Sequence, residues 1–169
     1  MDRVRRLDAT LKSTLGFLER AEEKVHRDIA PVLADTVRSW LPAVTSNRYV
    51  DVRVDPESLA VRVRAEGGSW RDAARLSHGT AEQIYLLLRI AVAGHLTKLG
   101  ETCPLILDDV TAQSDEKRTT AILGMLHQIS ETRQVILFSQ EREILEWGQE
   151  NLRSLQDGLI VLDPSVIGT

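Results

Sequence analysis

The sequence predicts an α/β domain with a mostly parallel sheet flanked by helices, preceded by a β-hairpin and an N-terminal helical segment. Three observations support this fold class. Apolar residues recur at helical spacing along residues 1–44, and an alternation with a period of two follows over residues 49–64. Beyond residue 103, short apolar runs typical of buried parallel strands alternate with longer helical stretches, which is the order of an α/β unit.

Composition and charge restrict the class of protein. The chain has 169 residues, of which 43% are hydrophobic and 27% charged, the balance of a soluble globular protein. The longest apolar stretch, residues 84–96, is interrupted by Arg89 and His95 and is too short to cross a membrane. The single cysteine, Cys103, permits no internal disulfide, which favours a reducing cytoplasm. A net charge of −4 argues against a chain that is basic throughout and coats DNA.

Residues 1–44 are expected to be helical and to form the end of a coiled coil. Apolar positions recur at spacings of three, four and seven residues: Leu7, Leu11, Leu15, Leu18 and Val25. A surface helix that packs one face on a domain is the alternative. Since proline favours the first turn of a helix, Pro31 predicts that a second helix runs from Ile29 to Leu41.

Residues 45–169 are expected to form the α/β domain. Its hairpin has a turn at 55–58, and a strongly apolar helix over residues 81–99 is expected at its centre. The remaining elements are expected in the order strand 104–109, helix 116–131, strand 134–138, helix 141–155 and strand 159–162.

Two adjacent carboxylates are the first candidate site residues. Asp108 and Asp109 end a strand that reads as buried, and open α/β sheets place their ligand sites at the carboxyl ends of strands. Because neighbouring strand residues point to opposite faces, one aspartate is expected to hold Mg²⁺ directly or through water while the other faces a reacting water. Two solvated carboxylates that merely end the strand are the alternative.

Three further polar positions border the predicted elements. Ser77 precedes the apolar helix, where backbone N–H groups and the helix dipole favour an anion, although Thr80 and Gln83 also fit an ordinary capping box. Asp115 stands at the start of the next helix and fits its N-cap equally well. Gln140 follows the second strand of the α/β unit and would overlook the same sheet edge.

In this order and spacing, the polar stretches resemble the motifs of ABC-type ATPases of the SMC, SbcC and RecN kind. Residues 76–83, Leu-Ser-His-Gly-Thr-Ala-Glu-Gln, resemble the signature motif, 105–109 the Walker B strand and 111–115 the D-loop. Gln140 falls where these ATPases carry the switch histidine. The resemblance covers about residues 45–162 and implies the C-terminal lobe of an ABC-type P-loop ATPase head, preceded by the returning end of a coiled coil.

The resemblance implies ATP and Mg²⁺ as cofactors. Asp108 would support Mg²⁺ on the ATP phosphates, and Asp109 would be the base or orient the water that attacks the γ-phosphate. Gln140 would sense the γ-phosphate. Two departures put these roles in question: aspartate stands at 109 where the family usually has glutamate, and glutamine replaces histidine at 140.

The resemblance also implies a second ATPase head as partner. Ser77 and the N–H of Gly79 would bind the γ-phosphate of an ATP held by that head, and Asp115 would bridge the two heads. The ATP-dependent dimer would open on hydrolysis and move its attached coils. His78 replaces a signature glycine, which is tolerable only if its side chain points away from the phosphate.

An expected phosphate cradle is absent from the sequence. The pattern Gly-x-x-x-x-Gly-Lys-Ser/Thr occurs nowhere in the chain, so there is no P-loop lysine for the β- and γ-phosphates. In the SMC-like architecture this loop belongs to an N-terminal Walker A lobe. We therefore expect the chain to need that lobe, on the same full-length polypeptide or on a partner subunit, before it binds ATP tightly or hydrolyses it.

Other readings of the sequence remain open. The chain could be a catalytically silent assembly module derived from such an ATPase, or a metal-dependent nuclease that uses Asp108 and Asp109 as ligands. DNA is the partner that the family resemblance implies. Arginines cluster around the hairpin and could contact phosphate or be solvated charges: Arg48, Arg53, Arg62, Arg64, Arg71 and Arg75.

Overall fold

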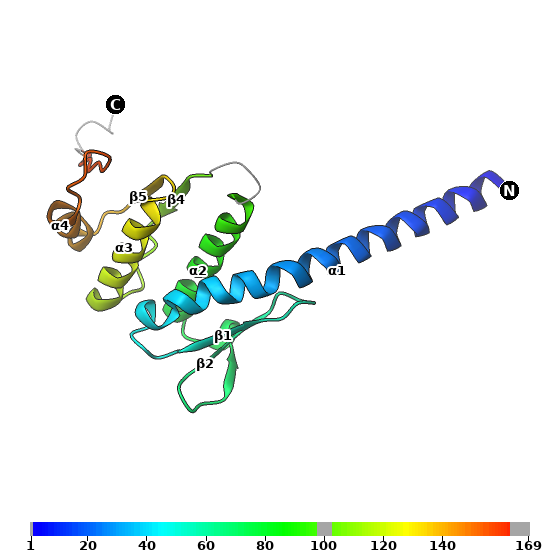
Figure 1. Ribbon diagram of the computed structural model, residues 1–169, viewed down its shortest axis with the longest axis horizontal. Helices are drawn as coiled ribbons and strands as arrows, with labels where there is room; N and C mark the ends of the chain where they lie inside the picture. Colours follow the sequence, from blue (N-terminus) through cyan, green and yellow to red (C-terminus); the bar gives the residue numbers. More distant parts are fainter. Residues whose placement is uncertain (1, 98–102, 163–169) are drawn as a thin grey trace.

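The computed structural model describes residues 2–97 and 103–162 (Figure 1). The elements follow in the order α1 (Asp2–Val44), β1 (Asp51–Val54), β2 (Val61–Arg64), β3 (Trp70–Asp72), the 3₁₀ turn η1 (Ala73–Arg75), α2 (His78–Thr97), β4 (Leu105–Asp108), α3 (Glu116–Ser130), β5 (Val135–Phe138) and α4 (Arg142–Asn151). The C-terminal half of α1 lies on the α/β body, and its N-terminal half projects away from it.

Helix α1 is continuous, and the prediction of a separate helix beginning at Ile29 is wrong. It runs from Asp2 to Val44 through Pro31 and Pro42. A proline inside a helix costs about 3 kcal/mol because it removes a hydrogen bond and crowds the preceding turn. Burial of the body-facing side chains outweighs that cost, since each contributes roughly 1.5–3 kcal/mol. They include Leu33, Val37, Leu41 and Val44, at most 4% exposed.

The projecting half of α1 presents an apolar seam to solvent. The seam consists of a and d positions of successive heptads and is made of Val4, Leu7, Leu11, Leu18 and Val25. Each of these side chains is 59–71% exposed. Residues 4–25 therefore do not pack on the domain as the surface-helix alternative requires. Their pattern is that of a coiled-coil helix.

The predicted hairpin is confirmed and extends into a three-stranded antiparallel sheet. Val52 pairs with Val63 in β1 and β2, and both are fully buried. The turn is held by Asp55, whose Oδ1 accepts from the N–H of Ser58 at 2.8 Å, the Ser58 hydroxyl at 2.8 Å and the N–H of Glu57 at 3.1 Å. These bonds lower the pKa of Asp55. Strand β3 was not predicted because three residues are too few to show an alternation.

Strands β4 and β5 form the predicted parallel pair, with Leu105 opposite Val135. Leu105 and Leu107 are buried in the core that α2 and α3 complete. The opposite face of the pair is open, because Ile106 is 66% and Phe138 51% exposed. The expectation of a strand buried on both faces is thus wrong for this face.

The C-terminal elements differ from the prediction. Helix α4 ends at Asn151 rather than Leu155, and residues 159–162 form no strand, being 44–83% exposed. Leu159 instead lies against α4, where its Cδ1 would be 3.2 Å from a Cβ added at Gly148. A strand needs a neighbour to satisfy its backbone, and β4 and β5 pair only with each other among the described residues.

Helix α2 begins at His78, before the predicted start at Ala81, while its expected end at Leu99 lies outside the described residues. Apolar side chains surround most of this helix, as predicted, and they form the centre of the core. Within residues 2–97 and 103–162, no helix has an apolar stretch sufficient to cross a membrane.

Candidate functional site

The N-terminus of α2 packs directly on the segment that joins β4 to α3. A Cβ added at Gly79 would lie 2.6 Å from the carbonyl oxygen of Gln113, closer than any real contact. One turn further along, Gln83 Nε2 donates to Ser114 Oγ at 3.0 Å. Glycine is therefore required at 79 by close approach of two backbones, and the signature-like and D-loop-like segments meet within one chain.

Ser77 stands immediately before α2. Its carbonyl accepts from the N–H of Ala81 at 2.9 Å, and its Oγ lies 2.9 Å from Thr80 Oγ1. The prediction that Thr80 and Gln83 form a capping box is wrong, because the helix has already begun and Gln83 reaches Ser114 instead. Ser77 is exposed, and the first N–H groups of α2 have no acceptor inside the helix. This end of α2 can accept an anion.

The side chain of His78 lies in solvent beside this helix end. It is 77% exposed, and its Nδ1 lies 3.3 Å from Glu82 Oε1. The imidazole is thereby held along the outer surface of α2. The substitution of histidine for glycine in the signature-like stretch leaves the helix terminus open, as the resemblance required.

Asp108 and Asp109 line the same cavity, contrary to the expectation that they face opposite sides. The reason is the backbone of Asp109, which has φ +46° and breaks the alternation of β4. Hydrogen bonds fix this turn: Asp109 N–H donates to Phe138 O at 3.0 Å, and Ala112 N–H donates to Asp109 O at 3.2 Å. The cavity has a volume of about 190 Å³.

Helix α2 supplies the opposite wall of this cavity with Glu82, Tyr85, Leu86 and Arg89. None of the sequence motifs assigns Tyr85, Leu86 or Arg89 to the site, although their spacing of three, four and seven from Glu82 places all of them on one helix face. The Oδ1 of Asp109 is buried without a hydrogen-bond partner in the described structure. A buried carboxylate oxygen without a donor is suited to accept from a bound water or ligand.

Gln140 lies just beyond the carboxyl end of β5, at the edge of the sheet where β4 also ends. The neighbouring Glu141 connects this end of β5 to the segment between β4 and α3, since its Oε2 accepts a hydrogen bond from Thr111 Oγ1 at 3.0 Å. Its N–H also donates to Ser139 Oγ at 3.1 Å. Gln140 itself is exposed at this edge.

Asp115 is the N-cap of α3, the alternative that the sequence left open. Its Oδ1 accepts from Arg118 N–H at 3.0 Å, and its Oδ2 lies 3.3 Å from Arg118 Nε. The carboxylate is still 61% exposed, so capping leaves much of it on the surface. The exposed part of the Asp115 carboxylate could contact a partner at an interface while its Oδ1 still caps α3.

Three segments thus meet along one edge of the domain: 77–83, 108–115 and 138–141. The oxygen donors present, Asp108 and Asp109, are of the type that Mg²⁺ prefers. The same edge offers open helix N–H groups for a phosphate. The donor set fits the metal and the anionic end of a nucleotide, whereas the P-loop that would hold the remaining phosphates is not in this sequence.

These elements, in this order, have the fold of an SMC-type ATPase head. An SMC ATPase structure described by "ATP-driven dimerization and DNA stimulated activation" matches with a TM-score of 0.59 and 14% identity, over 73% of this chain and 76% of that one. An SMC head with an extended coiled coil bound to the C-terminal domain of ScpA, from Pyrococcus furiosus, gives 0.56 and 16%, over 84% and 37%. The SMC head domain of Thermotoga maritima gives 0.52 and 16%, over 74% and 44%. At these identities the likeness shows the fold alone.

In sequence, the chain is 31% identical over 111 residues to YhaN, an uncharacterised protein of Bacillus subtilis. The match takes in 64% of this chain and 11% of YhaN, so this chain spans a small part of that relative. No protein-family model matches the chain.

Proposed function

We propose that this chain acts as the C-terminal lobe of an SMC-like ATPase head and supplies the signature motif, Walker B and D-loop for ATP-dependent dimerisation and hydrolysis. One observation carries the proposal above all. Asp108 and Asp109 both line one cavity beside α2, and the Oδ1 of Asp109 is buried without a hydrogen-bond donor among the described residues. That arrangement leaves one carboxylate for a metal and one for a water.

Within this cavity the two aspartates have different surroundings. Asp108 is exposed and is proposed to support Mg²⁺, which would neutralise charge on the ATP phosphates. Asp109 is half-buried, and its unpartnered Oδ1 is proposed to accept a proton or a hydrogen bond from the attacking water. Gln140, at the end of the neighbouring strand, would donate a hydrogen bond to the γ-phosphate.

The end of α2 is proposed to contact nucleotide held by a second head. Ser77 and the N–H of Gly79 are at an open helix N-terminus, where an anionic γ-phosphate is favoured. The exposed part of Asp115 would bridge the two heads. The solved SMC ATPase described with ATP-driven dimerisation supports this arrangement by its fold.

A Walker A lobe is the proposed partner within each head. The chain has no P-loop, and the open face of β4 and β5 exposes Ile106 and Phe138. Such a face gains free energy when another layer covers it. Residues 1–44 would then be the end of a coiled coil that pairs along the seam of α1, and residues 45–169 the lobe itself.

DNA is the proposed partner of the whole assembly, and the three-stranded sheet is where this chain would contact it. Its outer face carries Arg53 and Arg64, whose guanidinium carbons lie 4.2 and 4.9 Å from the ring centre of Trp70. Arg64 also pairs with Asp51 at 3.0 Å, so part of this positive charge is neutralised within the chain. Replacing Arg62, on the same strand as Arg64, by alanine should weaken binding to a DNA duplex and make it less sensitive to salt.

Hydrolysis is tested with Asp109→Asn in the full-length protein, joined to its Walker A lobe. Asparagine also tolerates the left-handed backbone at this position, so the fold should persist. Because the substitution removes the proton acceptor, phosphate release should fall by about a hundredfold or more. Equal rates for the two proteins would contradict the catalytic role and favour a silent assembly module.

Dimerisation is tested with Ser77→Arg, which places a bulky cation at the helix end. Sedimentation velocity with ATP and Mg²⁺, in the hydrolysis-deficient Asp109→Asn background, should show a dimer that Ser77→Arg abolishes. Ser69→Arg, the same change in the exposed turn between β2 and β3, should leave the dimer intact. Loss of the dimer in both variants would indicate a general effect of the added charge.

The nuclease alternative receives no support from the geometry. A two-metal site requires several carboxylates that converge. In the described parts of the chain, no group of three or more histidine, cysteine, aspartate or glutamate side chains is placed to hold a metal ion. The ATPase reading uses the residues that are present.

A further inference from the structure

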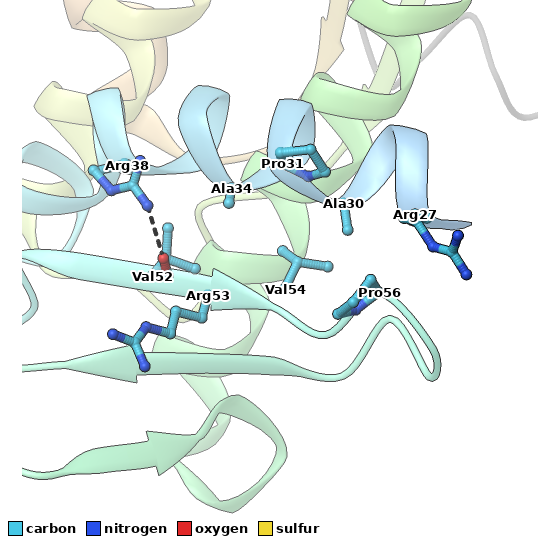
Figure 2. Close-up of a pocket in the computed structure, with 9 residues that line it drawn as sticks. All are labelled: Arg27, Ala30, Pro31, Ala34, Arg38, Val52, Arg53, Val54 and Pro56. Atoms are coloured by element: carbon cyan, nitrogen blue, oxygen red, sulfur yellow. Dashed lines mark hydrogen bonds between the residues drawn. The ribbon is translucent and has the colours of Figure 1, made fainter. Parts of the chain in front are cut away.

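A groove of about 350 Å³ lies between α1 and the edge strand β1, away from the nucleotide site (Figure 2). Small and apolar residues from both elements and the following turn form its floor and walls: Ala30, Pro31, Ala34, Val52, Val54 and Pro56. Three arginines complete the lining: Arg27, Arg38 and Arg53. The lining contains no acidic side chain.

Both walls carry backbone groups that are not used in secondary structure. Asp55 N–H bonds to Ala60 O in the hairpin, so by alternation the backbone groups of Val52 and Val54 point to the outer edge of the sheet. Val52 O accepts from Arg38 Nη2 at 3.1 Å, the dashed bond in Figure 2. No described side chain hydrogen-bonds to the backbone of Val54. Its N–H and C=O are therefore free to pair with an extended chain added at the edge of the sheet.

On the opposite wall, Pro31 lies within α1 and has no N–H to donate. The carbonyl of Arg27, four residues earlier, therefore lacks its helical donor. Arg27 lines the groove with its side chain exposed at the rim. The helix wall and the strand wall thus both offer polar groups beside an apolar floor.

The charge of the groove is positive at its open rim. Arg38 is bound by Asp35 at 2.6 Å and by Asp51 at 3.1 Å, and Arg53 stacks over Trp70. Arg27 has no ion-pair partner among the described residues, so its charge is available to a ligand. A ligand with carboxylates would complement this rim without having to displace an existing pair.

The groove stays open when a coiled-coil partner pairs along the seam of α1. At about 100° per residue, the groove-facing positions 27, 31, 34 and 38 lie on the side of the helix opposite that seam, roughly 180° round the axis. A helix packed on the seam would therefore leave the groove uncovered. The groove and the seam are separate surfaces of the same helix.

We propose that this groove binds a short, extended, acidic segment of a partner protein. An apolar side chain of the segment lies on Ala34 and Val54, its backbone bonds to the free groups of Val54 at the edge of β1, and its carboxylates pair with Arg27. A nucleic acid is disfavoured as the occupant because phosphates would leave the apolar floor unfilled. This is the extended-peptide mode of recognition at a sheet edge.

The test selects short random peptides from a display library on the immobilised full-length protein. The enriched peptides are then labelled and their affinity is measured by fluorescence anisotropy. We expect sequences with net negative charge around one large apolar residue. Arg27→Glu should weaken their binding by about tenfold or more, the size of effect expected for a central charged contact. Peptides without net negative charge, or no enrichment at all, would overturn the proposal.

Two variants separate binding in the groove from a general effect of charge or folding. Arg6→Glu makes the same charge change on the same face of α1, three heptads earlier, and should leave the affinity unchanged. Ala34→Leu fills the floor and should weaken binding, with thermal unfolding used to verify that the variant folds. If Arg6→Glu weakens binding as much as Arg27→Glu, or if a folded Ala34→Leu binds normally, the groove is not the site.

A charge exchange supplies a readout that a structural defect cannot produce. Peptides in which lysine replaces the acidic residues should bind the Arg27→Glu variant better than they bind the parent protein.

A short DNA duplex is the probe for a nucleic acid as the alternative occupant. If it competes with the peptide and loses affinity in Arg27→Glu but not in Ala34→Leu, the groove is a phosphate site and the peptide proposal fails. Concentration-dependent self-association that Arg27→Glu abolishes would identify a second copy as the occupant and also contradict the proposal.

Discussion

Gly79 illustrates how one residue joins two motifs. Its missing side chain lets the carbonyl of Gln113 approach to a place where a Cβ would be 2.6 Å away. Gly79→Ala should therefore push the segment after β4 off α2 and destabilise the fold by about 1–3 kcal/mol, the usual cost of overpacking. Thermal unfolding followed by circular dichroism measures this as a lower Tm.

The matched control is Gly124→Ala in the exposed middle of α3, where nothing lies within 4 Å of an added Cβ. There the substitution should stabilise the protein by about 0.5–1 kcal/mol, because alanine loses less backbone entropy than glycine in a helix. A fall in Tm of equal size at both positions would mean that close packing at Gly79 is not the cause.

At the scale of single residues, sequence reasoning located the two aspartates but not their relation. The alternation of a strand predicts opposite directions for Asp108 and Asp109. The left-handed backbone of Asp109 interrupts that alternation, and no local sequence pattern predicts this conformation. The α2 side of the cavity was accessible to prediction, since Glu82, Tyr85 and Arg89 share one helix face. The sequence pattern does not show which strand end this helix face contacts in the fold.

At the scale of elements, Asp51 fastens α1 to the hairpin. Its carboxylate accepts from Arg38 Nε at 3.1 Å, Arg64 Nη2 at 3.0 Å and the N–H of Val52 at 2.9 Å. Burial raises the pKa of Asp51, but the hydrogen bonds from Arg38 and Val52 and the charges of both arginines lower it more. The net pKa lies below the ordinary value of 3.8. The stabilisation is therefore present above that value and is lost as pH falls through the lowered pKa.

Asp51→Asn should cost about 1 kcal/mol of unfolding free energy at pH 7, the upper range for a partly exposed ion pair. It should also reduce the loss of stability on acidification below about pH 4, because the group that protonates is gone. Urea denaturation at neutral and acid pH measures both effects. Asp8→Asn, which removes only an exposed pair with Lys12 on the projecting part of α1, should leave the acid-dependent loss unchanged. An identical acid response in Asp51→Asn and the parent would contradict the argument.

The elements that sequence reasoning predicted well are those that local patterns specify. The hairpin follows from alternating valines and from a turn closed by Asp55, both of which are local. Pro31, also a local signal, predicted a break in α1. The prediction is wrong because packing of the helix on the body outweighs the free-energy cost of a proline inside it. The prediction of a strand at residues 159–162 is wrong because tertiary contacts are missing there: a strand-like composition forms no strand without a neighbouring strand to pair with.

At the scale of the whole molecule, the parallel pair of β4 and β5 has one covered and one open face. Neighbouring residues on β4 therefore allow a test of what covers the open side. Leu107, only 8% exposed, lies in the core, and Leu107→Lys should unfold the protein because it buries a charge without a partner. Ile106, 66% exposed, points the other way, and Ile106→Lys should change the stability of the 169-residue chain by less than about 0.5 kcal/mol.

If a Walker A lobe covers the open face, Ile106→Lys should have a strong effect only when the two lobes meet. Co-expression of the chain with that lobe, followed by size-exclusion chromatography, should yield a complex for the parent and separate lobes for Ile106→Lys. The physical reason is that the lysine would be desolvated under the second layer, whereas in the single lobe it stays in water. Leu155→Lys, a change at an equally apolar and fully exposed position beyond α4, controls for added surface charge. A complex that forms as well with Ile106→Lys as with the parent would mean that the second lobe joins elsewhere, and that the proposed nucleotide site is completed from a different side of the domain.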